Sequence, residues 1–228
     1  MKLHRFYIEI PLKTGEEINI EDKNKLHQWL NVFRMKSGDK VVLFNGNGKE
    51  YESVFTEIHK AKAVLEIGKE NPSILPSKEI HLYMSVIKKD LFELVVEKAT
   101  ELGVTKIIPI ETQRSIDKHL NFERLNKIAI ESSEQCGRGD IPIIEQINNL
   151  QFGVNNAKGE ILICNMDGVS AKSYKLAAKS YSLFVGPEGG WGEKDIKIFQ
   201  NRKATFVSLG KTILRAETAA IVGIANIN

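Results

Sequence analysis

The chain has 228 residues, of which 42% are hydrophobic and 27% are charged, and its formal net charge is +3. These values are near the average for globular proteins, and they exclude a disordered or fibrous chain and a polycationic nucleic-acid tail. Only two cysteines, Cys136 and Cys164, and no apolar leader at the start predict a reducing, cytoplasmic location. No apolar run approaches the length of a membrane span, so no membrane association is expected.

Residues 1–72 have the pattern of a small β domain. Strands are expected at residues 3–10, 40–44, 51–58 and 63–67, with one helix at 22–33. The segment Asn45-Gly46-Asn47-Gly48 lies between two of these strands and is a strong hairpin signal. Pro72 and Pro76 then mark a linker, because proline disfavours helix and removes ladder donors. We predict an antiparallel barrel of about 70 residues that ends at residue 72.

Beyond the linker, strands and helices alternate. Strands are expected at residues 79–86, 106–110, 161–166, 182–186 and 205–209. Helices are expected at residues 88–102, 121–135, 171–179, 194–201 and 216–227, the second of them capped by Asn121. Such alternation is typical of an α/β domain in which helices cover a mostly parallel sheet. Ligands of these sheets bind at the carboxyl ends of the strands, so we expect a site just after Met166, Gly186 and Leu209.

A glycine-rich segment, residues 185–192, joins a predicted strand to a predicted helix. Glycine allows a ligand to approach the backbone closely, although a tight structural turn explains the same composition equally well. Glu188 stands where the dinucleotide-binding motif requires its second glycine, and this excludes that motif. A carboxylate would also repel a pyrophosphate. The segment therefore favours a neutral or cationic ligand.

The segment 208–219 resembles a phosphate-binding loop at first sight, because a glycine and a lysine follow a predicted strand. The Walker pattern requires a glycine at the position of Thr205, and this excludes a nucleotide-hydrolysing site of that type. Arg215 and Glu217 open the next helix, where the glutamate complements the helix dipole and the arginine opposes it. Two interpretations remain open: a local surface pair, or a polar pair at the mouth of the ligand cleft.

The other polar candidates are weaker. Cys136 precedes Gly137, a typical glycine after a helix end, and no histidine lies nearby in the sequence, so a structural role is favoured over a nucleophile. Arg114 and Arg138 suit phosphate contacts, although a single arginine is more often a solvated surface residue. The five histidines and two cysteines show no metal-ligand spacing, so we predict no metal site.

Four stretches occur in the order and with the content of one known family. They are residues 98–104 (KATELGV), 134–138 (EQCGR), 186–190 (GPEGG) and 208–219, which contains SLG and ILRAETA. The chain resembles, over essentially its whole length, the RsmE family of 16S ribosomal RNA uridine N3-methyltransferases of the SPOUT class. Lys211 and Thr212 stand where the family often has Pro-Arg, which weakens any role for those two side chains.

The resemblance implies a PUA-like RNA-binding β-barrel at residues 1–72 and a SPOUT-type trefoil-knotted α/β domain at residues 73–228. It also implies a homodimer, and 16S ribosomal RNA or the small ribosomal subunit as substrate. The implied methyl donor is S-adenosyl-L-methionine, bound in the knot. The residues that would bind it are Met166, Gly186, Pro187, Glu188, Gly189, Leu209, Gly210, Ile213 and Leu214. Small residues of the last helix, such as Ala219 and Gly223, fit close packing either within the chain or between two chains.

The chemistry of the implied reaction suggests roles for the polar residues. N3 of uridine carries a proton, so the site must supply a general base or a cation that stabilises the anion. Glu217 is the candidate base, and Arg215 or Arg114 is the candidate cation near the uracil oxygens. Because N3 lies on the Watson–Crick edge, the target base must be unpaired or turned out of its stack. Arg5, Arg114 and Arg138 are expected to contact the RNA backbone.

Two other functions stay open. One is a non-catalytic RNA-binding module, which would bind RNA without S-adenosylmethionine. The other is a SPOUT methyltransferase that acts on transfer RNA. The segment 134–138 and the N-terminal barrel favour the ribosomal substrate, through the resemblance alone. Residues 141–228 carry 10 basic and 7 acidic residues, whereas residues 1–74 carry 12 and 11. RNA contact by the barrel therefore depends on a few well-placed cations.

Overall fold

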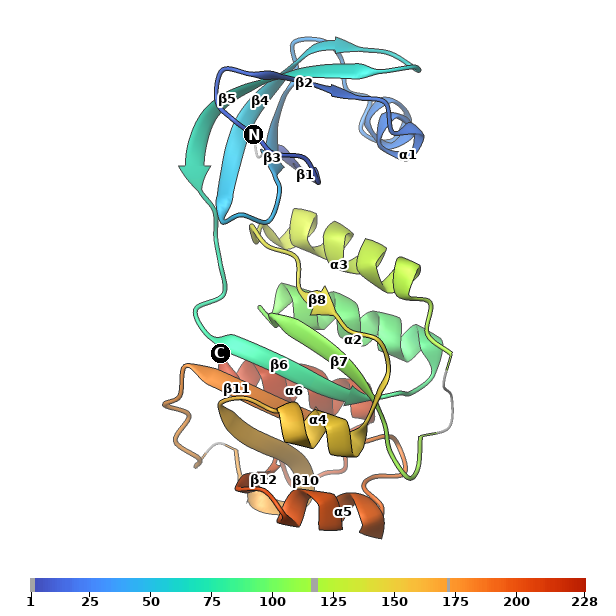
Figure 1. The fold of residues 1–228 in the computed structure, drawn as a ribbon, viewed down its shortest axis with the longest axis vertical. Coiled ribbons are helices and arrows are strands. Elements are labelled where there is room, and N and C mark those ends of the chain that lie inside the picture. Colours follow the sequence, from blue (N-terminus) through green and yellow to red (C-terminus); the bar gives the residue numbers. More distant parts are fainter. Residues whose placement is uncertain (1–2, 116–118, 172) are drawn as a thin grey trace. The chain divides into compact units, whose positions relative to one another are not determined.

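The computed structural model describes residues 3–115, 119–171 and 173–228. The contacts within the chain define two compact units, residues 1–75 with 133–140 and residues 76–132 with 141–228. Figure 1 labels most of the elements of each unit. In the described part of the chain, no helix is both long enough and apolar enough to cross a membrane.

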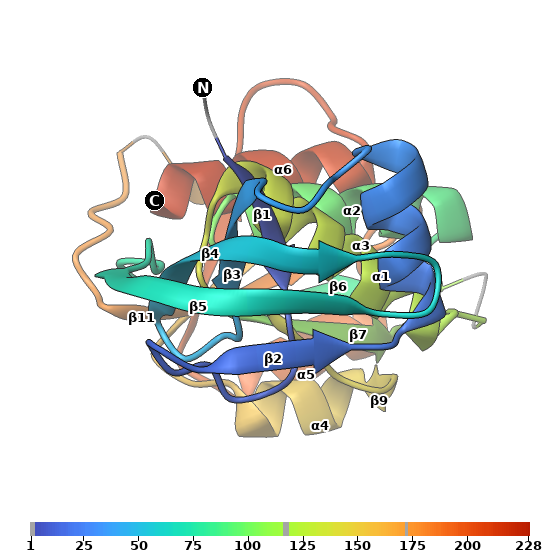
Figure 2. The same ribbon diagram turned by 90° about the horizontal axis from the view of Figure 1, so that it is seen from above.

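The first unit is built on a five-stranded sheet. Its strands are β1 (His4–Tyr7), β2 (Glu17–Ile20), β3 (Lys40–Phe44), β4 (Lys49–Ile58) and β5 (Ala63–Pro72), in the order β1-β3-β4-β5-β2. Figure 2 shows β4, β5 and β2 side by side. The predicted antiparallel pairing is right for β2 to β5 and wrong for β1, which runs parallel to β3. The parallel pair forms because the chain passes through β2 and a helical segment before it returns to β3.

The hairpin signal is confirmed. β3 and β4 pair in antiparallel register from Lys40 opposite Val54 to Phe44 opposite Glu50. Gly46 and Gly48 in the connection have φ angles of 82° and 83°, a region that glycine enters without steric cost.

The helical segment of the first unit changes type in its middle. α1 (Lys23–His27) begins after Asp22, whose carboxylate accepts the Lys25 N–H at 2.7 Å. It continues as a π-helical turn, η1 (Gln28–Val32), which carries the fully buried Trp29. Trp29 packs edge-on against Phe55 at a centroid distance of 5.1 Å, and this contact fixes the segment on the sheet.

The second unit contains a seven-stranded sheet in which every pair is parallel. Its strands are β6 (Glu79–Ser85), β7 (Lys106–Glu111), β8 (Ile143–Ile144), β9 (Asn148–Asn149), β10 (Glu160–Ser170), β11 (Ser180–Val185) and β12 (Ala204–Ser208). The order is β12-β10-β11-β6-β7-β8, and β9 also pairs with β7. The predicted α/β class with a parallel sheet is confirmed.

Helices cover both faces of this sheet (Figure 1). They are α2 (Lys89–Glu101), α3 (Phe122–Cys136), α4 (Leu150–Asn156), α5 (Glu193–Gln200) and α6 (Ala216–Ile227). On β6, Leu82 and Met84 point into the core that α2, α3 and α6 share, while Tyr83 points to the opposite face. There Tyr83 stacks on Phe184 at 4.3 Å, in a core that α4 and α5 close. Burial on both faces explains the nearly continuous apolar run of β6.

One predicted helix, at residues 171–179, is wrong; residue 172 lies outside the described residues. β10 runs on to Ser170 beside β12, and the Ala171 N–H donates to the Ser208 carbonyl at 2.9 Å. The chain then forms turns, and the Tyr174 hydroxyl donates to the Glu160 carboxylate. These contacts outweigh the helix propensity of the segment. The trefoil knot stays a prediction from the resemblance.

Candidate functional site

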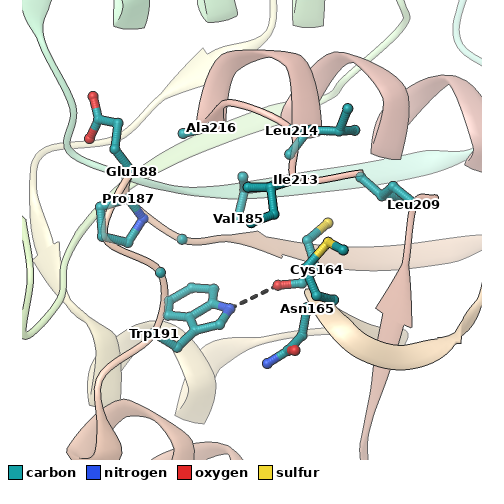
Figure 3. Close-up of a pocket in the computed structure, with 14 residues that line it drawn as sticks. Cys164, Asn165, Val185, Pro187, Glu188, Trp191, Leu209, Ile213, Leu214 and Ala216 are labelled. Carbon is teal, nitrogen blue, oxygen red and sulfur yellow. Dashed lines mark hydrogen bonds between the residues drawn. The ribbon is translucent and has the colours of Figure 1, made fainter. Parts of the chain in front are cut away.

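A cavity of about 220 Å³ lies at the carboxyl ends of the parallel strands. Three parts of the second unit line it: the middle of β10, the end of β11 with the loop after it, and the loop after β12 with the first turn of α6. Figure 3 shows the loop residues Pro187 and Trp191 on one side and Leu209 on the other. The lining residues are Cys164, Asn165, Met166, Val185, Gly186, Pro187, Glu188, Gly190, Trp191, Leu209, Ile213, Leu214, Ala216 and Ala219.

The structure brings together most of the residues that the resemblance assigns to the cofactor. Those that line the cavity are Met166, Gly186, Pro187, Glu188, Leu209, Ile213 and Leu214. Gly189 and Gly210 belong to the same loops but are not among the lining residues. The predicted cofactor set did not contain the other lining residues, which are Cys164, Asn165, Val185, Gly190, Trp191, Ala216 and Ala219. Cys164 and Asn165 lie inside β10, where the sequence carries no motif.

An irregularity in β10 turns two side chains toward the cavity. The pairing of β10 with β12 shifts register between Cys164 and Val169. A Cβ on Gly168 would lie 2.5 Å from the Phe206 carbonyl carbon, so only glycine permits this close approach. The bulge re-aims the strand. As a result, Asn165 and Met166 line the cavity.

Trp191 connects the glycine-rich loop to β10. Its indole Nε1 donates to the Cys164 carbonyl at 2.9 Å, the dashed line in Figure 3. A Cβ on Gly186 would lie 3.1 Å from the Trp191 ring, so the glycine allows the ring to close over the loop. The loop is thus held in a defined conformation against the neighbouring strand.

The loop after β7 contacts the same glycine-rich segment. The Arg114 side chain is exposed, and its Nη1 donates to the Gly189 carbonyl at 2.5 Å. Asp195, which is 3% exposed, accepts the Gly192 N–H at 2.9 Å and the Gln113 N–H at 3.2 Å. Arg114 is therefore near the cavity wall but is not one of the lining residues.

Arg215 and Glu217 lie on either side of the lining residue Ala216 and do not form an ion pair with each other in the described part of the chain. Arg215 is the exposed N-cap residue of α6. Glu217 is only 7% exposed, and its Oε2 has no hydrogen-bond partner among the described residues. The interpretation as a local surface pair is therefore wrong. A buried carboxylate oxygen without a partner is costly, and such groups mark sites that a ligand or substrate completes.

Arg5 and Arg138 are not solvated surface residues, contrary to expectation. The Arg5 guanidinium is paired with Glu50 and has a side-chain exposure of 9%. Its Nη2 also donates to the Arg138 carbonyl at 3.3 Å. The Arg138 side chain is 5% exposed and donates to both oxygens of Asp140, at 2.9 and 2.7 Å. The two ion pairs compensate both positive charges, and the hydrogen bond from Arg5 to the Arg138 carbonyl joins the segment 133–140 to the rest of the first unit.

The lining of the cavity carries little charge. Glu188 is the only charged residue among those that line it. Burial raises the pKa of the Cys164 thiol to about 12, so this thiol is not a nucleophile at neutral pH. Among the residues that the structure describes, no group of three or more His, Cys, Asp or Glu side chains is arranged to hold a metal ion.

Comparisons with known proteins agree with this architecture. A family described as RNA methyltransferase domain matches residues 75–228, and one described as RNA methyltransferase PUA domain matches residues 30–68. The crystal structure of a ribosomal RNA small subunit methyltransferase E from Neisseria gonorrhoeae, bound to S-adenosyl methionine, superposes with a TM-score of 0.91 at 28% identity. The match covers 98% of this chain and 96% of that one. The class is therefore that of the RNA methyltransferases with an N-terminal PUA domain.

Two curated relatives identify the family within this class of RNA methyltransferases. Ribosomal RNA small subunit methyltransferase E of Rickettsia conorii is 32% identical, over 100% of this chain and 96% of the relative. The protein of the same name from Aquifex aeolicus is 34% identical, over 96% of each chain. The chain belongs to the ribosomal RNA small subunit methyltransferase E family, as its motifs predict.

Proposed function

We propose that this protein methylates N3 of a uridine in 16S ribosomal RNA, with S-adenosyl-L-methionine as the methyl donor. The observation that carries the proposal is the cavity at the carboxyl edge of the sheet. Its lining includes residues of two of the four family motifs, 186–190 and 208–219, and a relative of the same fold was crystallised with S-adenosyl methionine. When bound, this cofactor supplies an electrophilic methyl group on a sulfonium centre.

The lining of the cavity fits such a ligand. Leu209, Ile213 and Leu214 offer apolar contacts for an adenine ring, and backbone groups of the glycine-rich loop can orient polar atoms. Glu188 gives the wall a negative charge, and no Lys or Arg is among the lining residues. A cation is favoured by such a wall and a phosphate is not, so the cavity suits a sulfonium compound better than a nucleotide.

Glu217 is the proposed general base. Its carboxylate lies one residue from the cavity wall, is largely excluded from water, and has an oxygen free of partners among the described residues. In the proposed reaction the N3–H proton of uridine passes to Glu217 and the N3 lone pair would form the new bond to the methyl carbon. The methyl–sulfur bond would break in the same step, and its electron pair would stay on sulfur, which leaves as a neutral thioether. Arg215, exposed beside it, and Arg114 are the proposed cations that stabilise negative charge on the uracil oxygens.

A homodimer is the proposed assembly, and a cytoplasmic location follows from the proposed ribosomal substrate. Within the chain, α6 buries Ala216, Ala220 and Gly223, so these small residues serve intrachain packing. The side chain left for a second copy is that of Ile213, which is 86% exposed at the mouth of the cavity. An apolar residue exposed to this extent beside a site is consistent with cover by a partner subunit.

The proposal is tested by methyl transfer from labelled S-adenosylmethionine to two substrates, small ribosomal subunits that lack the modification and unmodified transfer RNA. Label in the ribosomal RNA alone supports the proposal. Label in transfer RNA alone would instead support a SPOUT methyltransferase of that specificity. RNA binding with no calorimetric signal for S-adenosylmethionine would support a non-catalytic RNA-binding module.

A further inference from the structure

A strained backbone segment lies on the first unit, far in sequence from the cavity residues. Arg34 has a φ of 56°, the only positive value at a non-glycine position in the described part of the chain. It lies two residues after the end of the π-helical turn η1, at Gln28–Val32. Both features are uncommon and energetically unfavourable, and each occurs preferentially where a protein presents residues for function.

Buried anchors on both sides hold this segment in place. Trp29 is fully buried, and Met35 is 7% exposed. The Met35 N–H donates to the Trp29 carbonyl at 2.8 Å, and the Phe33 N–H donates to the Gln28 carbonyl at 3.0 Å. The core of the unit therefore imposes the conformation, and the residue that it pushes outward in a left-handed conformation is an arginine.

Three of the exposed residues of the segment 32–40 are cationic. Arg34, Lys36 and Lys40 are all exposed, and none of them forms an ion pair in the described part of the chain. The one acidic residue among them, Asp39, accepts the backbone N–H of Lys36 at 2.8 Å. Val32, 63% exposed, adds an apolar contact next to Arg34. By contrast, Arg5 is already neutralised by Glu50.

We infer that residues 32–40 form an RNA-binding surface in which Arg34 contacts a backbone phosphate. This inference rests on the proposed function, because it names the part of the first unit that contacts the ribosomal RNA. An arginine fork matches two phosphate oxygens, and Lys36 and Lys40 add positive charge on either side of the same turn. The surface is open, which suits a polymer backbone. Val32 supplies an apolar contact for a sugar or a base.

The test uses the full chain and a variant that keeps the backbone but removes the cation, Arg34→Gly. Binding to 16S ribosomal RNA transcribed in vitro is measured between about 50 and 200 mM salt. We expect binding to weaken on the order of 10-fold and the slope of log K against log salt to fall by roughly 1. Glycine tolerates positive φ, so the melting temperature should stay within about 2 °C of the wild type. The matched control is Lys60→Gln, an exposed cation in the turn between β4 and β5, which should bind within about twofold.

Two results would overturn the inference. One is an Arg34→Gly protein with wild-type affinity and salt slope. The other is a melting temperature that falls in step with affinity, because Arg34 would then be a structural residue. Methyl transfer by the wild type is assayed in parallel. A wild type that binds RNA but transfers no methyl group would refute the proposed function, whereas the loss of RNA affinity in Arg34→Gly would still support the surface.

Discussion

The carboxylate of Asp195 accepts the backbone N–H of Gln113, 82 residues earlier in the chain, at 3.2 Å. The same carboxylate accepts the Gly192 N–H at 2.9 Å. Gln113 returns the contact, because its side-chain oxygen accepts the Lys194 N–H at 3.2 Å. One buried acid therefore connects the loop that carries Arg114 to the glycine-rich loop that lines the cavity.

We expect Asp195→Ala to loosen both loops. Loss of a charged acceptor leaves the Gly192 and Gln113 N–H groups without their partner, which should lower the free energy of unfolding by about 2–4 kcal/mol. Affinity for S-adenosylmethionine should fall as well, because the glycine-rich loop is no longer held. Denaturant unfolding and calorimetry measure the two effects. The control is Glu193→Ala, an exposed residue of the same helical turn. Equal losses of unfolding free energy and of S-adenosylmethionine affinity in the two variants would mean that Asp195 does not hold the two loops.

Gly192→Ala should be harmful for a steric reason. The new Cβ would lie 2.2 Å from Oε1 and 2.9 Å from Cβ of Gln113, so one of the two loops must move. We expect the melting temperature to fall by at least about 4 °C, equivalent to roughly 1–2 kcal/mol in a chain of this size. Gln113→Ala in the same protein should restore only part of the loss, because the Cβ contact remains.

The matched control for this substitution is Gly189→Ala. There a Cβ would meet the flexible Arg114 side chain at an ordinary 3.4 Å. Its melting temperature should change by less than about 2 °C. A Gly192→Ala protein as stable as the Gly189→Ala protein would mean that the two loops are not packed as described.

Glu217→Gln tests the proposed base. The amide keeps the shape of the side chain but cannot take up the N3 proton, so we expect kcat to fall by about 10²–10⁴-fold. The dissociation constant for S-adenosylmethionine should change little, because Glu217 is not a lining residue. Unchanged turnover would remove Glu217 from the mechanism.

The Cys164 thiol should be unreactive at neutral pH. Burial raises its pKa to about 12, from an ordinary 9.0. The pKa of the Cys164 thiol is higher in the folded chain than in the unfolded chain. The contribution of this thiol to the free energy of unfolding is therefore fully present below pH 9 and is lost as the pH rises toward 12. In a Cys136→Ser background we expect negligible maleimide labelling at pH 7–8, and even slower labelling with S-adenosylmethionine bound. Cys164 is only partly buried as a residue, since it faces the cavity. Rapid labelling that the ligand does not slow would contradict the assignment of the cavity.

Much of the fold follows from local sequence patterns. The last helix is found at Ala216–Ile227 as predicted, and the cap at Asn121 is confirmed by its side chain accepting the Arg124 N–H at 3.0 Å. The wrong helix at 171–179 and the unexpected parallel pairing of β1 have a common reason. Both depend on which strand lies alongside, and strand partners distant in sequence leave no trace in local periodicity.

In the candidate site, too, the sequence predicts the features that local patterns decide and not those that depend on contacts between distant residues. Glycine motifs point to Gly186 and Leu209, because a tight turn after a strand requires particular residues. Nothing local indicates that Arg5 would be neutralised by Glu50, 45 residues away, or that Asp195 would reach Gln113. Local patterns therefore located the loops of the site. The pairing of charges was decided by tertiary contacts that only the folded chain reveals.

The most direct test of the central claim is the chemical identity of the product. Small ribosomal subunits that lack the modification are incubated with the protein and methyl-labelled S-adenosylmethionine, and the digested RNA is resolved into nucleosides by mass spectrometry. The account predicts label in N3-methyluridine from 16S ribosomal RNA, and its loss in Leu209→Trp, which fills the cavity. Label in any other nucleoside, or none in ribosomal RNA that the wild-type protein binds, would contradict it.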